Sequence, residues 1–348
     1  MLLALLIGGV GGAVFAWFDL PLAWMLGAMA ATMAGSFAGA DIAVPQSLRK
    51  PMIAIVGIIL GSTFTSDRFE DVIKWLPSVA TMPIYVLALG APILFYLRKV
   101  SGFDHKTAFF AATPGGLSEM TILADQLGGD LRSVAMFHSA RLVLIIFSIP
   151  LMTSFFVAIE PVASPIVPEQ AISPVDLASL IAMAALGWFV GQQCRLPAAS
   201  FMGPLLVSTA AHLTGLVALS PPAFMLAAAQ LVIGASVGAR FSGIPLRAIG
   251  RILVIGGGGA LMMFALTLIF AAVLHLLTGY PMTLLLLALI PGGFPEMSLI
   301  ALSMGMDPAF VVTHHGIRTL LIFAFAFPIF TLLTRLRWFE RHWPITKR

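Results

Sequence analysis

Apolar residues along the chain fall into long segments that are separated by short polar loops. The segments lie roughly at 2–18, 22–40, 51–65, 76–97, 107–127, 133–158, 176–192, 198–217, 222–240, 251–277, 281–304 and 308–333. Most have the length of helices rather than of strands. Apolar runs of about 18 residues or more are typical of membrane-spanning helices. The pattern therefore predicts an all-α polytopic membrane protein. No charge precedes Asp19, so we expect the first segment to be a retained helix and not a signal peptide.

The first six segments are repeated by the last six, at a nearly constant offset. The run that begins at Pro114 recurs 177 residues later at Pro291, and small residues recur at the same distance, as Gly57 and Gly61 do in Gly234 and Gly238. Rare polar types at one constant offset indicate duplication of an ancestral unit. Paired glycines four apart also predict close helix packing. The predicted organisation is a first repeat at 1–158, a Pro-rich linker at 159–175, a second repeat at 176–333 and a basic tail at 334–348.

Lys and Arg positions favour one membrane topology. If both Pro-Gly-Gly segments are re-entrant or broken and do not cross, each repeat has five transmembrane helices and the second repeat is inverted. All loop and tail Lys and Arg residues except Arg68 and Lys74 then lie on the side of the N-terminus. If both segments cross, five arginines move to the other side: Arg132, Arg195, Arg240, Arg247 and Arg251. The positive-inside rule favours the first arrangement. It predicts inverted repeats in a bacterial cytoplasmic (inner) membrane, with both termini cytoplasmic and an extracytoplasmic linker.

Composition excludes several other classes of protein. Hydrophobic residues make up 59% of the 348 residues, and only 19 Lys+Arg and 15 Asp+Glu are charged. Soluble domains carry roughly 25% charged residues, so neither a soluble enzyme nor a disordered chain fits. The net charge of +4 arises from short loops between apolar runs, so it does not indicate nucleic-acid binding. Cys194 is the only cysteine, which excludes an intramolecular disulfide and a Cys-based metal site.

A Pro-Gly-Gly break inside an apolar segment is the first candidate functional feature. It frees backbone N–H and C=O groups, which must be enclosed by protein or line a wet cavity. A glutamate, Glu119 or Glu296, follows three residues after the second glycine of each break. One interpretation is that these glutamates cap their own helices. The other is that an ionisable group at membrane depth takes part in function. Freed backbone groups at such a break can hold an anion, Na⁺ or a proton donor.

A His and an Arg three residues apart follow each break, as His138 with Arg141 and His315 with Arg318. This spacing puts both side chains on one helix face. We expect each Arg to pair with a break glutamate, either as a structural ion pair or as part of a polar centre that binds substrate and a coupling ion. The His could carry a proton. His314 has no twin in the first repeat and reads as incidental or asymmetric. Asp130 and Asp307 read as N-caps.

The chain resembles the AbrB-type membrane protein family over essentially its whole length. The resemblance rests on the two Pro-Gly-Gly breaks, each followed by a helix that bears the His and Arg pair. Members are often labelled ammonia monooxygenase or regulator. The family is remotely similar to inverted-repeat carriers, among them cation/proton antiporters, bile-acid symporters and citrate- or glutamate-sodium carriers. The resemblance therefore implies transport, although a shared fold alone does not establish function.

The sequence favours a secondary transporter that moves a small, anionic solute by alternating access coupled to H⁺ or Na⁺. An integral membrane regulator or sensor is the alternative, and a membrane oxidoreductase is third, because no HxH or HxxxH pair is present to anchor a metal. Partners expected are the lipid bilayer, a solute and a second copy in a homodimer, with no nucleic acid, cofactor or metal. The predicted substrate- or ion-binding residues are Pro114, Gly115, Gly116, Ser118, Glu119, His138, Arg141, Pro291, Gly292, Gly293, Glu296, His315 and Arg318.

Overall fold

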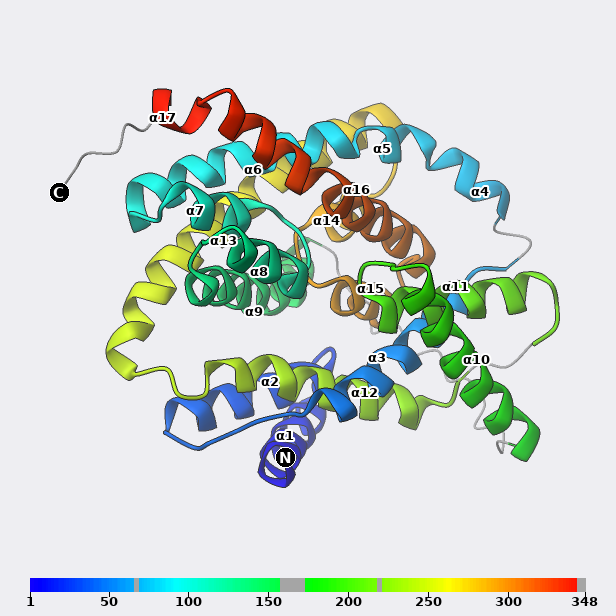
Figure 1. Cartoon of the computed structure of the whole chain (residues 1–348). Helices are drawn as coiled ribbons and strands as arrows, with labels where there is room; N and C mark the ends of the chain where they lie inside the picture. The colour runs from blue at the N-terminus through cyan, green and yellow to red at the C-terminus, as the bar shows by residue number, and fades with distance from the viewer. Residues whose placement is uncertain (66–68, 157–172, 218–220, 343–348) are drawn as a thin grey trace.

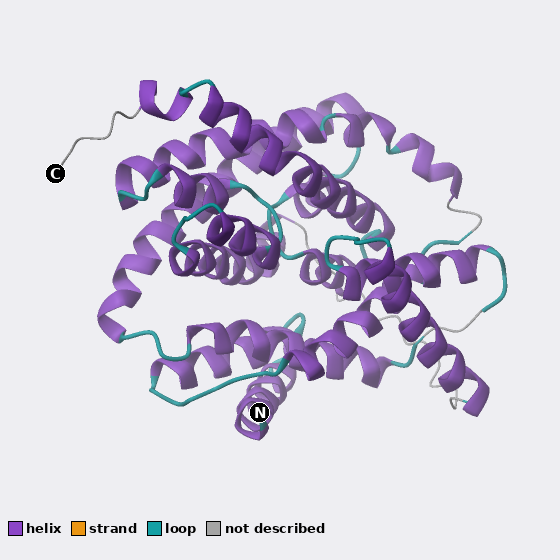
Figure 2. Ribbon diagram, in the orientation of Figure 1, coloured by secondary structure: helices purple, strands orange, loops and turns teal. Residues whose placement is uncertain are grey.

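The structure, a computed structural model, describes residues 1–65, 69–156, 173–217 and 221–342. These residues form helices and connecting loops, with no strand among them (Figures 1 and 2). The prediction of an all-α protein with long apolar helices is confirmed. Most of the predicted linker, 159–175, lies outside the described residues, as do the last residues of the predicted tail.

The helices of the first half follow the predicted segments. They are α1 (Leu2–Trp17), α2 (Ala23–Phe37), α3 (Gln46–Gly61), α4 (Phe69–Lys74), α5 (Leu76–Ala80), α6 (Met82–Tyr96), the π-helix η2 (Leu97–Ser101), α7 (His105–Ala112), α8 (Leu117–Gln126) and α9 (Leu131–Phe156). The segment expected at 76–97 is thus divided into α5, α6 and the start of η2.

The helices of the second half follow the same order. They are α10 (Pro174–Gln193), α11 (Ala199–Leu213), α12 (Ala223–Gly238), the 3₁₀ helix η3 (Ala239–Phe241), α13 (Leu246–Thr278), α14 (Met282–Leu289), α15 (Phe294–Ser303), α16 (Pro308–Arg335) and α17 (Trp338–His342). Here one long helix, α13, stands where the first half has α4, α5, α6 and η2.

Six described helices have the length and composition to cross a membrane. They are Met82–Ser101, Leu131–Ile149, Pro174–Gln193, Ala223–Phe241, Ala248–Thr278 and Pro308–Arg335. The apolar helices α1, α2 and α11 have 15 or 16 residues, which at 1.5 Å per residue is somewhat less than the roughly 30 Å of a bilayer core. Ten crossings and an inverted second repeat therefore remain predictions.

Helices of the first half pack directly against helices of the second half. Helix α2 packs on α12, and the equivalent pair α3 and α11 packs in the same way (Figure 1). Glycines permit both contacts. A Cβ on Gly57 would lie 2.7 Å from the backbone oxygen of Phe201, and a Cβ on Gly234 would overlap the backbone oxygen of Met25. The repeated glycines thus hold one half against the other, as small residues do between membrane helices.

Each Pro-Gly-Gly segment separates two short helices. Helices α7 and α14 have 8 residues, and α8 and α15 have 10. Proline has no N–H and cannot continue a helix. The second glycine of each break, Gly116 or Gly293, has extended backbone angles and begins the next helix. Each segment is therefore a broken helix, and at about 12–15 Å its pieces are too short to span a bilayer alone.

Candidate functional site

A histidine closes each break by bonding to a carbonyl that proline leaves without a donor. The Nε2 of His138 lies 3.0 Å from the backbone oxygen of Phe110, and the Nε2 of His315 lies 2.9 Å from that of Leu287. In a continuous helix these oxygens would accept from residues 114 and 291, which are prolines. Because a carbonyl only accepts, Nε2 donates in both cases. Nδ1 of a neutral ring is then an acceptor.

Arg318 holds the second break through three hydrogen bonds. Its Nη1 donates to the backbone oxygens of Leu289 at 2.6 Å and Ile290 at 2.9 Å, at the end of α14. Its Nη2 donates to Nδ1 of His315, 2.8 Å away. Arg318 and His315 are 3% and 0% exposed. His315 supplies the donor that the Leu287 carbonyl lacks, and Arg318 adds a charged donor to the carbonyls of Leu289 and Ile290.

Tyr85 joins this network from α6, and the sequence did not identify it as a site residue. Its hydroxyl lies 2.8 Å from the backbone oxygen of Leu289, to which it donates, and 2.9 Å from Oγ1 of Thr267 on α13. At the repeat offset Tyr85 corresponds to Met262, so duplication gave no signal. The signal available was a tyrosine within an apolar segment, since a buried hydroxyl needs a partner.

Arg141 lies close to the same centre. Its guanidinium interacts electrostatically with Arg318 and with Tyr85. Its side chain is 3% exposed, and its Nε and Nη1 have no hydrogen-bond partner among the described residues. The two buried arginines, one from each half, thus belong to one cationic region.

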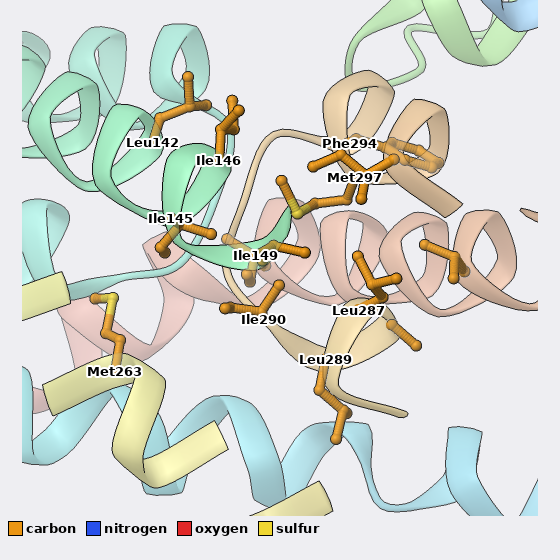
Figure 3. Packing of buried hydrophobic residues seen from close by; sticks show 14 of the residues in the cluster. Leu142, Ile145, Ile146, Ile149, Met263, Leu287, Leu289, Ile290, Phe294 and Met297 are labelled. Atoms are coloured by element: carbon orange, nitrogen blue, oxygen red, sulfur yellow. The ribbon is translucent and has the colours of Figure 1, made fainter. Parts of the chain in front are cut away.

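The breaks themselves are packed against helices of the opposite half. A Cβ on Gly115 would lie 2.9 Å from Cγ2 of Ile322 on α16, and a Cβ on Gly293 would lie 3.0 Å from Cδ1 of Leu142 on α9. Figure 3 shows Leu142 and its neighbours on α9 facing Ile290 and Met297 of the second break. Each break thus contacts the helix that carries the His and Arg pair of the other half.

The expected pairing between arginine and the break glutamates is wrong. Among the described residues, neither Arg141 nor Arg318 bonds to a carboxylate. Glu119 Oε1 instead accepts from the backbone N–H of Ala198, 3.2 Å away, at the start of α11 in the other half. Glu296 is 3% exposed and interacts electrostatically with Arg240. Arg318 bonds to the backbone carbonyls of Leu289 and Ile290 instead of to a glutamate, because these carbonyls lie within its reach at the end of α14.

Among the described residues, neither glutamate accepts a hydrogen bond from a backbone N–H of its own helix. The N-cap of each helix is a glycine, Gly116 or Gly293, which has no side chain to accept one. Each carboxylate nevertheless folds over the preceding glycine, so that a Cβ on Gly116 or Gly293 would overlap the Oε2 of Glu119 or Glu296. Glycine at these positions lets the carboxylate approach the helix start, where the dipole favours a negative charge.

The remaining predicted residues lie at or near the breaks. Pro114 and Pro291 are buried, whereas Ser118 is exposed.

His314 is buried, and its ring forms a hydrogen bond of 2.9 Å with Ser78 on α5. This bond gives His314 a structural role that has no equivalent in the first half. Helix capping by Asp130 and Asp307 is confirmed by their bonds to backbone N–H groups of Arg132 and Ala309. A hydrogen bond from Ser133 lowers the pKa of Asp130.

A second charged cluster lies beside Glu296 and was also missed. Arg49 donates from Nε to Oγ of Ser236, 3.1 Å away, and lies in electrostatic contact with Arg240, as does Glu296. Neither arginine recurs at the repeat offset, and the sequence analysis used both only as indicators of orientation. The negative charge of Glu296 therefore offsets part of the mutual repulsion between Arg49 and Arg240.

The arrangement suits an anion better than a metal ion. The central side chains are donors, and the N-termini of α8 and α15 add partial positive charge. Within the described ranges, no three His, Cys, Asp or Glu side chains gather at metal-binding distance.

Comparisons with known proteins identify the family. The chain is 25% identical over 354 residues to "Uncharacterized protein YhjN" of Bacillus subtilis (strain 168), covering 95% of this chain and 92% of that protein. It is 27% identical over 305 residues to "Putative regulator AbrB" of Escherichia coli (strain K12), covering 86% of each. No solved structure matches. The family model described as "Transition state regulatory protein AbrB" matches residues 24–334, so the chain belongs to the AbrB family.

Proposed function

We propose that this protein is a secondary transporter that moves a small anionic solute by alternating access, coupled to H⁺ or Na⁺. The observation that carries the proposal is the pair of buried guanidinium groups, Arg141 and Arg318, which have no carboxylate partner among the described residues. Arg318 bonds to the end of α14, Arg141 interacts electrostatically with Arg318, and each broken helix packs against a helix of the opposite half. Buried charges in membrane proteins ordinarily mark a substrate or ion pathway.

The broken helices support the same function. Discontinuous helices place half-helix N-termini near anionic groups, and freed carbonyls near coupling cations, in inverted-repeat carriers. Here α8 and α15 each begin after a Pro-Gly-Gly break, so their N-termini are the part of this arrangement that matches, while the carbonyls of Phe110 and Leu287 accept from His138 and His315. The contact of Glu119 with Ala198 crosses between the halves. Such a contact is one that alternating access would make and break.

Flux into proteoliposomes tests the proposal. The purified full-length protein is reconstituted, an inward H⁺ or Na⁺ gradient is imposed, and uptake of labelled small carboxylates, phosphate and sulfate is measured against protein-free vesicles. We expect gradient-dependent uptake of at least one anion, together with H⁺ or Na⁺ entry. Absence of gradient-driven uptake across the panel contradicts the anion-transport proposal.

An integral membrane regulator or sensor is the second candidate. It is supported by the word regulator in the name of the Escherichia coli relative and in the description of the family. The same buried cations would then bind an anion without moving it. Binding to purified protein combined with no flux in proteoliposomes would favour this alternative.

A further inference from the structure

The two His and Arg pairs occupy equivalent positions but have different hydrogen bonding. In the second half, Arg318 leaves only Nε without a partner, and His315 uses both ring nitrogens. In the first half, His138 uses Nε2 alone. The Nδ1 of His138 and the Nε and Nη1 of Arg141 are buried without a hydrogen-bond partner among the described residues. Duplication has thus produced one satisfied pair and one unsatisfied pair.

The difference follows from the surroundings of the two arginines. Arg318 reaches the backbone oxygens of Leu289 and Ile290 at the end of α14. The equivalent oxygens of the first break belong to Ala112 and Thr113, and Arg141 bonds to neither. Its neighbours Arg318 and Tyr85 both donate to the carbonyl of Leu289, and no hydrogen bond joins Arg141 to either of them.

An unpaired charge is among the most costly groups to bury, and an apolar residue in the same volume would stabilise the fold. Arg141 at 3% exposure therefore requires a compensating group. That group must be an acceptor, since a guanidinium has only donors, and it must be negatively charged, since a second guanidinium lies nearby. An oxyanion meets both requirements, because its oxygens accept from Arg more strongly than neutral acceptors do.

We propose that Arg141, together with His138, is the contact for a small oxyanion, and that Arg318 is a positioning residue that fixes the second break. The proposal rests on the anion transport proposed above and names the side chain that holds the anion. Nδ1 of His138, an acceptor in the neutral ring, is available to a hydroxyl or acid proton carried by the same ligand. Because Arg141 is buried, the anion reaches it when the contacts between the halves open.

Thermal unfolding of the purified protein separates the two roles without any assumption about flux. In anion-poor buffer, Arg318→Met should lower the Tm by about 5 °C or more, because it removes three buried hydrogen bonds and leaves Nδ1 of His315 without its donor. Arg141→Met, which removes donors that have no partner, should leave the Tm unchanged or raise it. A loss of stability in Arg141→Met as large as that in Arg318→Met would overturn the proposal.

Anion binding is measured on the same samples with acetate, malonate, phosphate and sulfate, each at constant ionic strength against chloride. At least one oxyanion should raise the wild-type Tm by about 2–4 °C at ten times its half-saturating concentration. The shift should be absent in Arg141→Met. Equal shifts in wild type and Arg141→Met, or no shift in wild type with any of the four anions, would overturn the proposal.

Arg141→Lys keeps the test decisive if Arg141→Met does not fold. Lysine retains the charge but lacks the planar guanidinium, so the anion-induced shift should be smaller than in wild type. An undiminished shift overturns the proposal. Failure of transport is distinguishable, because anion-dependent stabilisation through Arg141 without flux in proteoliposomes would leave this inference standing and remove only the transport proposal.

Discussion

At the scale of single residues, each buried histidine replaces a backbone donor that proline lacks. His138 and His315 bond to the carbonyls four residues before Pro114 and Pro291. This bond explains why a histidine stands at the same place in both repeats, and it does not require the ring to gain or lose a proton. It therefore replaces the sequence-based interpretation of these residues as proton carriers. It leaves the break glutamates as the ionisable groups closest to the helix starts.

The histidine bond predicts a compensating substitution. His315→Ala should lower the free energy of unfolding by about 1–3 kcal/mol, because the carbonyl of Leu287 is then buried without a donor. Pro291→Ala supplies an N–H at the residue from which that carbonyl would accept in a helix. Combining the two should therefore cost less than the sum of the single changes, as measured by thermal unfolding. Strictly additive losses would show that His315 does not act through the proline break.

The break glutamates are predicted to affect activity rather than insertion. Glu119→Gln and Glu296→Gln each remove a charge from a membrane-embedded helix start, and the charge is the costly part of insertion. We expect normal amounts in the membrane and reduced gradient-driven uptake in proteoliposomes. Asp125→Asn, an exposed carboxylate on the same helix as Glu119, is the control and should resemble wild type. Wild-type uptake by both Gln variants would leave the glutamates with a structural role only.

At the scale of helices, glycine decides which surfaces touch. Gly57 on α3 and Gly234 on α12 let each helix approach a backbone of the other half. The sequence predicted close packing at these glycines from their spacing, but a spacing does not name the partner. The structure pairs α3 with α11 and α12 with α2, so the glycines join the two repeats instead of stabilising each one separately.

This contact predicts a strong difference between two Gly→Ala substitutions. Gly57→Ala places a Cβ 2.7 Å from the backbone oxygen of Phe201, so the helices must separate, and overpacking typically costs about 1–3 kcal/mol. Gly90→Ala on α6 meets nothing within 4 Å and should be neutral or slightly stabilising, because alanine favours a helix. Thermal unfolding of both variants in the same detergent checks this. Equal Tm values would contradict the assigned α3 and α11 contact.

At the scale of the whole molecule, apolar side chains are exposed over much of the outer surface. Trp17, Leu216 and Leu276 are each at least 80% exposed. Such a surface suits a hydrocarbon environment and not water. The Pro-Gly-Gly segments of both breaks are buried or half-buried in the protein, which suits irregular backbone at membrane depth.

The orientation of the molecule is the prediction at this scale. We expect the C-terminus in the cytoplasm and the 159–175 linker on the opposite side, because this topology leaves only Arg68 and Lys74 among the loop and tail cations outside. Reporter fusions at residue 348 and within the linker measure it, with a fusion in the 242–245 loop as a second site expected in the cytoplasm. A cytoplasmic linker would exclude the inverted repeat.

The sequence by itself determined the helical class, the duplicated units, both Pro-Gly-Gly breaks and the residues that follow them. These follow from apolar periodicity, from proline's missing N–H and from identities at a constant offset, all of which are local properties. Only the tertiary structure decided the partners. Arg318 bonds to carbonyls instead of to a glutamate, and Tyr85 reaches a break without any repeat signal. Among the described residues, Arg141 has no hydrogen-bond partner at Nε or Nη1, whereas Arg318 has none only at Nε. Equivalent positions in a duplicated sequence meet different neighbours once the chain folds, so partner choice depends on contacts between distant segments.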